Sequence, residues 1–126
     1  MMQRFYFFFS NSRTAWISRL FRPGYQHVEL VGEIGDIIFR LNPRWGRVDY
    51  EITSTYTLAS VIQQLKDQGH TVVMYSCEIP DPQKRIARGP LITCASYLAY
   101  TIGLSFAGIT PYQLYKTLKA RGGIDV

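Results

Sequence analysis

The sequence predicts an α+β domain in which one mostly antiparallel sheet is flanked by helices. Three observations lead to this prediction: several short segments alternate apolar and polar residues, Gly- and Pro-containing turns separate them, and most helical periodicity follows them in the chain. The 126 residues suit one hydrophobic core. We therefore assign residues 1–126 to a single domain.

Five segments have the pattern of strands, and four have that of helices. The predicted strands are residues 3–9, 27–31, 36–41, 47–53 and 71–77, with a hairpin turn at 32–35 and a strand end at Asn42-Pro43. The predicted helices are residues 12–21, 57–68, 93–104 and 111–120, and a basic, proline-rich loop spans residues 79–90. Helices thus lie on the flanks of the sheet and at the C-terminal end.

The uncharged run from Leu91 to Ile109 approaches the ~20 residues needed to span a bilayer. However, Gly103 and Gly108 would weaken a continuous helix. Thr110-Pro111-Tyr112-Gln113 then forms a capping box, which marks the start of a new helix. We therefore predict two separate helices and no transmembrane segment.

Composition excludes a disordered chain, because 47% of the residues are hydrophobic and 18% are charged. The net charge is +5, but Lys and Arg are spread along the chain, so nucleic-acid binding is not expected. The apolar run Phe5 to Phe9 is too short for a signal peptide, so we expect synthesis in the cytoplasm without such a peptide. Cys77 and Cys94 are expected to be free thiols.

Three polar residues form the candidate catalytic set. Cys94 follows a Gly-Pro break at a predicted helix start, where backbone amides favour a thiolate and lower the pKa of the thiol. His27 begins a predicted strand and can act as a general base. The third group must accept a hydrogen bond from the imidazole. On the next predicted strand, Asn42 is our first choice and Asp36 our second.

No metal or other cofactor is expected. The two histidines and two cysteines lack the spacing of a metal site. His70 follows Gly69 at a junction between a loop and a strand, so we expect it to be an exposed turn residue. Tyr112 and Tyr115 have helical spacing and are expected in the core or in an interface.

The order of the candidate residues resembles that of circularly permuted papain-like proteins, which include NlpC-type amidases and lecithin:retinol acyltransferase-like proteins. In that group the cysteine helix follows the histidine strand, as Cys94 follows His27 here. More narrowly, GPLITC (residues 89–94) and TPYQLYKTL (residues 110–118) resemble the end of small phage-encoded proteins. The resemblance covers the chain from about residue 25 to residue 118.

This resemblance implies a role for each member of the set. Cys94 would be the nucleophile, His27 the general base and Asn42 the residue that orients the imidazole. An aspartate commonly stands where this chain has Asn42, so the imidazolium has weaker electrostatic support here. The second histidine of the acyltransferase-like branch is absent, which argues against lipid acyl transfer.

The function implied by the resemblance is a cysteine hydrolase, an amidase or peptidase that cleaves cell-wall stem peptides. Its setting would be a virion, in a phage tail or an apparatus that passes the cell wall. A second hypothesis is a non-catalytic structural or assembly protein that keeps the papain-like fold and docks to other tail proteins through its aromatic surface. A weaker alternative is a thioesterase or acyltransferase.

Overall fold

The computed structural model describes residues 2–11, 21–44, 47–53, 56–78, 93–104, 108 and 110–126. The predicted loop at 79–90 lies outside the described residues, as does all of the predicted helix at 12–21 except its last residue. The remaining predicted elements can be compared with the structure.

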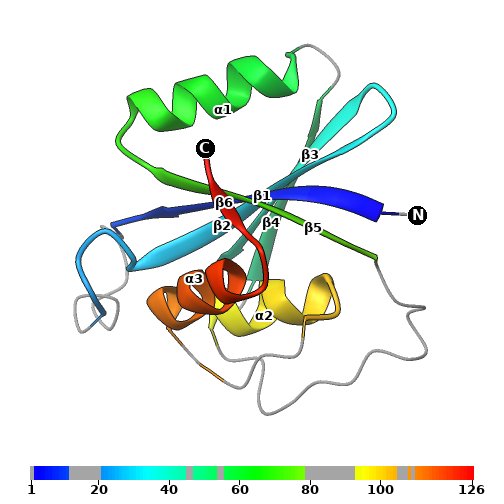
Figure 1. Cartoon of the computed structure of the whole chain (residues 1–126). Helices are drawn as coiled ribbons and strands as arrows, with labels where there is room; N and C mark the ends of the chain where they lie inside the picture. The colour runs from blue at the N-terminus through cyan, green and yellow to red at the C-terminus, as the bar shows by residue number, and fades with distance from the viewer. Residues whose placement is uncertain are drawn as a thin grey trace.

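Within these residues, six strands form one open antiparallel sheet (Figure 1). The strands are β1 (Met2–Ser10), β2 (His27–Ile34), β3 (Ile37–Arg44), β4 (Arg47–Thr53), β5 (Thr71–Glu78) and β6 (Ile124–Asp125). Their order across the sheet is β4-β3-β2-β1-β5-β6, so β1 lies inside the sheet and β4 forms one edge. The predicted α+β class with a single antiparallel sheet is confirmed.

Three helices of the described residues cover the two faces of the sheet. They are α1 (Leu58–Asp67), α2 (Cys94–Thr101) and α3 (Pro111–Ala120). Figure 1 shows α1 on one side of the sheet, with α2 and α3 together on the other. The domain therefore has three layers, and the candidate nucleophile lies in the layer formed by α2 and α3.

The aromatic strand β1 is buried on both faces, which explains its nearly continuous hydrophobic sequence. Phe5, Phe7 and Phe9 pack in the cluster that includes α2 and α3. Tyr6 and Phe8 point the other way and pack in the cluster that includes α1. The period of two along a strand thus divides one sequence run between two cores.

The hairpin of β2 and β3 differs from the predicted one at both ends. The turn is tighter than expected, because Ile34 pairs with Ile37 and Gly35 takes a positive φ of 60°. Gly32, predicted as a turn residue, belongs to β2 and lies opposite Phe39. β3 also continues beyond Asn42-Pro43 to Arg44 along its partner β4. Proline is tolerated there because the pairing with β2 extends only to the Leu30–Leu41 pair.

The predicted division of the C-terminal apolar run into two helices is confirmed. α2 ends at Thr101, earlier than predicted, and Gly103 follows with a positive φ of 73°. Thr110 caps α3 through the predicted capping box, in which its hydroxyl accepts from the backbone N–H of Gln113. In the part of the chain that the structure describes, no helix is long and apolar enough to cross a membrane.

Candidate functional site

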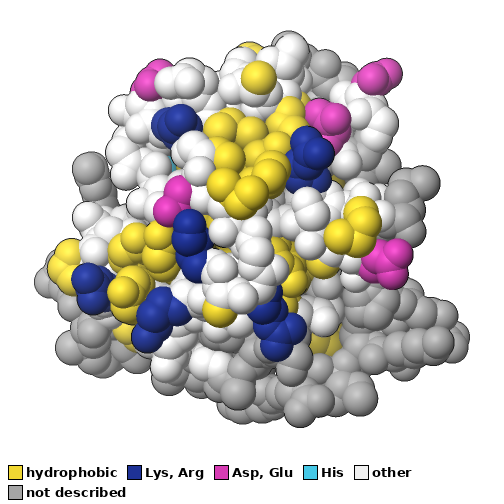
Figure 2. Space-filling model, viewed as in Figure 1, with side chains coloured by type: hydrophobic (Ala, Val, Ile, Leu, Met, Phe, Trp, Pro, Cys, Tyr) yellow, Lys and Arg dark blue, Asp and Glu magenta, His cyan; other side chains and the backbone are white. Residues whose placement is uncertain are grey.

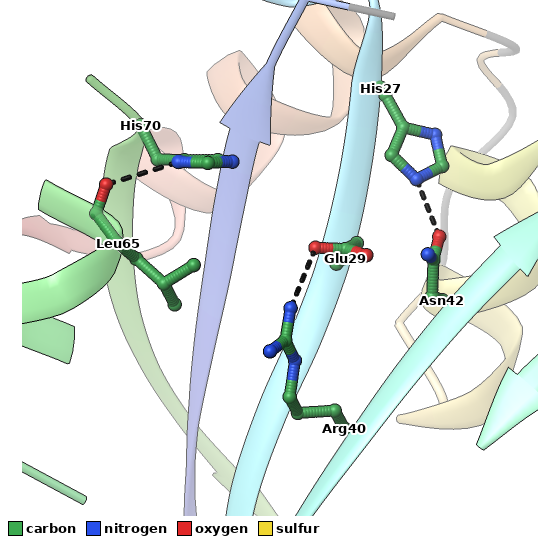
Figure 3. Close-up of polar contacts among 6 residues, drawn as sticks. All are labelled: His27, Glu29, Arg40, Asn42, Leu65 and His70. Carbon is green, nitrogen blue, oxygen red and sulfur yellow. Dashed lines mark hydrogen bonds and ion pairs between the residues drawn. The ribbon is translucent and has the colours of Figure 1, made fainter. Parts of the chain in front are cut away.

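A hydrogen bond joins the side chains of His27 and Asn42 across the open end of the β2–β3 hairpin. The distance from His27 Nε2 to Asn42 Oδ1 is 2.6 Å. Figure 3 shows the two side chains pointing toward each other from neighbouring strands. Both residues lie beyond the last β2–β3 pair, Leu30 with Leu41, so their side chains bridge the strands where the ladder has stopped.

This bond determines which ring nitrogen of His27 can act as a base. The carbonyl oxygen of Asn42 can only accept, so Nε2 carries the proton and donates it. In the neutral ring, Nδ1 then has a free lone pair that can take up a proton. The alternative partner, Asp36, is exposed in the turn at the opposite end of the hairpin. The structure therefore brings Asn42 to His27 and leaves Asp36 away from it.

Cys94 is the first residue of α2, and local sequence explains why the helix begins there. Thr93 has extended backbone angles, and its hydroxyl accepts from the backbone N–H of Ser96 at 3.2 Å. The Ser96 hydroxyl in turn accepts from the backbone N–H of Thr93 at 3.1 Å. This reciprocal capping box places Cys94 in the first turn. The side chain is partly buried against the cluster that includes Val28.

The pKa of the Cys94 thiol is raised above its ordinary value, which corrects the expectation that the helix start would lower it. Burial is the main cause, because it disfavours the charged thiolate. The backbone N–H groups of Val28, Ala95 and Cys94 itself act in the predicted direction, but burial outweighs them. The Glu29 carboxylate adds to the rise by charge repulsion. The thiol is therefore protonated in this arrangement at neutral pH.

Cys94 and His27 are not hydrogen-bonded to each other, and they face opposite sides of the sheet. Cys94 packs in the cluster that includes α2 and α3. Strand alternation places His27 with Glu29 on the α1 side, where the partner of Glu29, Arg40, lies over Phe8. The backbone N–H of Val28, the residue next to His27, interacts with the sulfur. Among the hydrogen bonds of the described residues, the imidazole bonds to Asn42 and none joins it to Cys94. The bond to Asn42 orients the imidazole, but proton transfer from Cys94 requires a rearrangement that brings the thiol and Nδ1 to the same side of the sheet.

An ion pair between Glu29 and Arg40 lies next to this site, and sequence reasoning did not identify it. Arg40 Nη2 is 3.4 Å from Glu29 Oε2, and the guanidinium lies 5.5 Å from the ring centre of Phe8. Figure 3 shows the pair beside His27 and Asn42. The signal was available, because Glu29 is two residues after His27 on the same strand and side chains two apart share a face.

Replacing Glu29 by glutamine is expected to lower the pKa of the Cys94 thiol, because a repelling charge is removed. Replacing Arg40 by glutamine should raise that pKa, since the Glu29 carboxylate would lose its neutralising partner. The measurement is the pH dependence of Cys94 alkylation in a Cys77→Ser background. Shifts in the same direction for both variants would contradict a charge effect and indicate a change in packing.

Two further predictions about individual residues can be compared with the structure. His70 is not an exposed turn residue: it is half-buried, its Nδ1 lies 3.0 Å from the backbone oxygen of Leu65, and its ring meets Phe8 edge-on. It thus closes the C-terminal end of α1. Cys77 and Cys94 are free thiols, as predicted, and burial raises the pKa of Cys77 as well.

The chain was compared with protein-family models, with curated proteins and with solved structures, and none of the three comparisons gave a match. The function proposed next is therefore based on the geometry of the site and on the sequence resemblance.

Proposed function

We propose that this protein is a cysteine hydrolase of the permuted papain-like type. The observation that carries the proposal is the 2.6 Å bond from His27 Nε2 to Asn42 Oδ1. It is accompanied by a cysteine in the first turn of α2, which packs in the cluster that contains Val28, the residue after His27. Such a bond is what a general base needs, because it fixes both the ring orientation and the tautomer. The order of histidine, asparagine and cysteine along the chain also agrees with the resemblance.

In the proposed reaction, Cys94 Sγ attacks the carbonyl carbon of an amide while His27 Nδ1 takes up the thiol proton. The imidazolium then donates this proton to the leaving amine, and a thioester remains on Cys94. Water activated by Nδ1 hydrolyses the thioester, which releases a carboxylic acid and restores the thiol. The backbone N–H of Cys94 at the helix start stabilises the oxyanion.

The raised pKa of Cys94 affects how this reaction proceeds. A protonated thiol is a poor nucleophile, so the enzyme depends on the transfer of its proton to His27 as the substrate binds. The proposed substrates are cell-wall stem peptides, and the proposed setting is a phage tail or an apparatus that passes the cell wall. Both follow from the sequence resemblance.

The test is the rate of Cys94 alkylation as a function of pH, measured in Cys77→Ser and in Cys77→Ser/His27→Ala. With His27 present, the thiol should react at a lower pH than without it, because the imidazole can take up the proton, although burial raises the pKa of the resting thiol above the free value of about 8.5. Without His27, the thiol should react only above that value, since its own pKa is raised. If the alkylation rate depends on pH in the same way with and without His27, the hydrolase proposal is wrong.

One observation favours the non-catalytic alternative, a tail structural or assembly protein. In this structure the thiol is not hydrogen-bonded to the imidazole, and burial keeps it protonated. A slow thiol, together with unchanged stability in His27→Ala, would support that alternative. Acyl transfer without any peptide cleavage would instead support the thioesterase or acyltransferase hypothesis.

A further inference from the structure

Two basic side chains surround one tyrosine at the start of α3. The Arg22 guanidinium lies 4.3 Å from the ring centre of Tyr112, and the Lys116 ammonium lies 5.1 Å from the same centre. Arg22 and Lys116 are exposed, and Tyr112 is half-buried. We call these three residues the α3 cationic patch. Figure 2 shows Lys and Arg side chains gathered around hydrophobic ones in the region of α3.

The α3 cationic patch lies beside the candidate site, because one short segment contacts both. Arg22 and Tyr25 contact Tyr112, with the two tyrosine ring centres 5.0 Å apart. Three residues after Tyr25, Val28 lies in the buried cluster against which both Tyr25 and Cys94 pack. Tyr112 and Cys94 are both in the first turn of their helices. Residues 22–28 therefore connect the patch to the thiol.

The positive charge of the patch is not neutralised by the described residues. Neither Arg22 nor Lys116 forms an ion pair with any carboxylate in the part of the chain that the structure describes. The carboxylates of Glu29 and Asp125 have other cationic partners. Glu29 pairs with Arg40, and Asp125 pairs with Lys119 at 3.1 Å. Two unpaired cations around an aromatic ring can hold a carboxylate and the apolar chain that carries it.

We propose that the α3 cationic patch binds a carboxylate of the substrate and so directs negatively charged amides to Cys94. This inference rests on the proposed hydrolase for its catalytic meaning, but the binding can be measured without hydrolysis. The ligand class is a peptide or peptide-like amide with a free carboxylate near the bond that is cleaved. Arg22 and Lys116 supply the charge, and Tyr112 supplies an apolar surface.

The first test compares the alkylation of Cys94 by iodoacetate, an anion, with that by iodoacetamide, which is neutral and of similar size. The ratio of the two rates cancels the pKa and the nucleophilicity of the thiol. In Cys77→Ser at low ionic strength, Arg22→Gln and Lys116→Gln should each lower the ratio about twofold, and the double variant about fourfold. Lys119→Gln is the matched control and should leave the ratio nearly unchanged, because Asp125 already pairs with Lys119.

The second test measures occupancy of the patch through protection of Cys94. N-acetylglutamate should slow alkylation by iodoacetamide, N-acetylglutamine should not, and the protection should disappear in Arg22→Gln/Lys116→Gln. A rate ratio that falls no further in the double variant than in Lys119→Gln overturns the proposal, as does equal protection by both compounds. If the alkylation of Cys94 does not depend on His27, the hydrolase proposal is wrong. Both tests of the α3 cationic patch still give a result in that case.

Discussion

Replacing Asn42 by leucine is expected to slow Cys94 alkylation near neutral pH by at least about tenfold, since a positioned acid–base group contributes about 10²- to 10⁴-fold. Leucine cannot accept the hydrogen bond that Asn42 Oδ1 receives from His27 Nε2. The ring then loses its fixed orientation, and either nitrogen can carry the proton. The rate is measured in the Cys77→Ser background, and under the proposed function hydrolysis of a stem-peptide amide should fall in parallel.

The matched control is Asn42→Asp, which keeps the acceptor and adds a negative charge. A carboxylate can only accept, so this variant should retain the rate and give the imidazolium stronger support. Thermal unfolding of both variants shows whether the fold is intact. A rate in Asn42→Leu equal to that of the parent would contradict the orienting role of Asn42.

Replacing Gly32 by alanine is expected to destabilise the fold by about 1–3 kcal/mol, the usual cost of overpacking. A Cβ at Gly32 would clash with Cζ of Phe39, whose ring covers this glycine from the opposite strand. The ring also packs against the cluster that includes α2 and α3, which limits its movement. Chemical denaturation gives the free energy of unfolding.

A double-mutant cycle separates this clash from a general loss of strand structure. Phe39→Leu alone should also be destabilising, because it uncovers the backbone of Gly32. In Gly32→Ala/Phe39→Leu the smaller leucine leaves room for the new methyl group of alanine. The loss of unfolding free energy in the double variant should therefore be smaller than the sum of the two single losses. Additive losses would show that the clash with the ring is not the cause.

The sequence was sufficient to predict most elements because their local signals agree with the packing. The spacing of Leu58, Val61, Ile62 and Leu65 matches the buried side of α1. Thr110 and Gln113 fix the start of α3. The predictions are wrong where a tertiary contact explains the choice of residue. Gly32 resembles a turn residue in the sequence, but it lies within β2, where the ring of Phe39 on the opposite strand occupies the space that a side chain would need.

For the candidate site, strand phase was enough to select Asn42 as a partner of His27, and the structure joins the two. The environment of Cys94 could not be predicted in the same way. The helix-start argument considers only nearby amides, whereas burial depends on residues far away in the chain, such as Val28. Arg22 and Tyr112 were likewise unrelated in the sequence, being 90 positions apart, and only the fold brings them together.

The central position of β1 has a consequence for how the chain folds during synthesis. β1 is made first among the strands, and its two neighbours are completed only at residues 34 and 78. Until β5 emerges from the ribosome, one hydrogen-bonding edge of the aromatic segment from Phe5 to Phe9 has no partner strand. An open aromatic edge of this kind invites pairing with another chain. Slower synthesis between residues 34 and 78 should therefore reduce the yield of folded protein and increase the demand for chaperones.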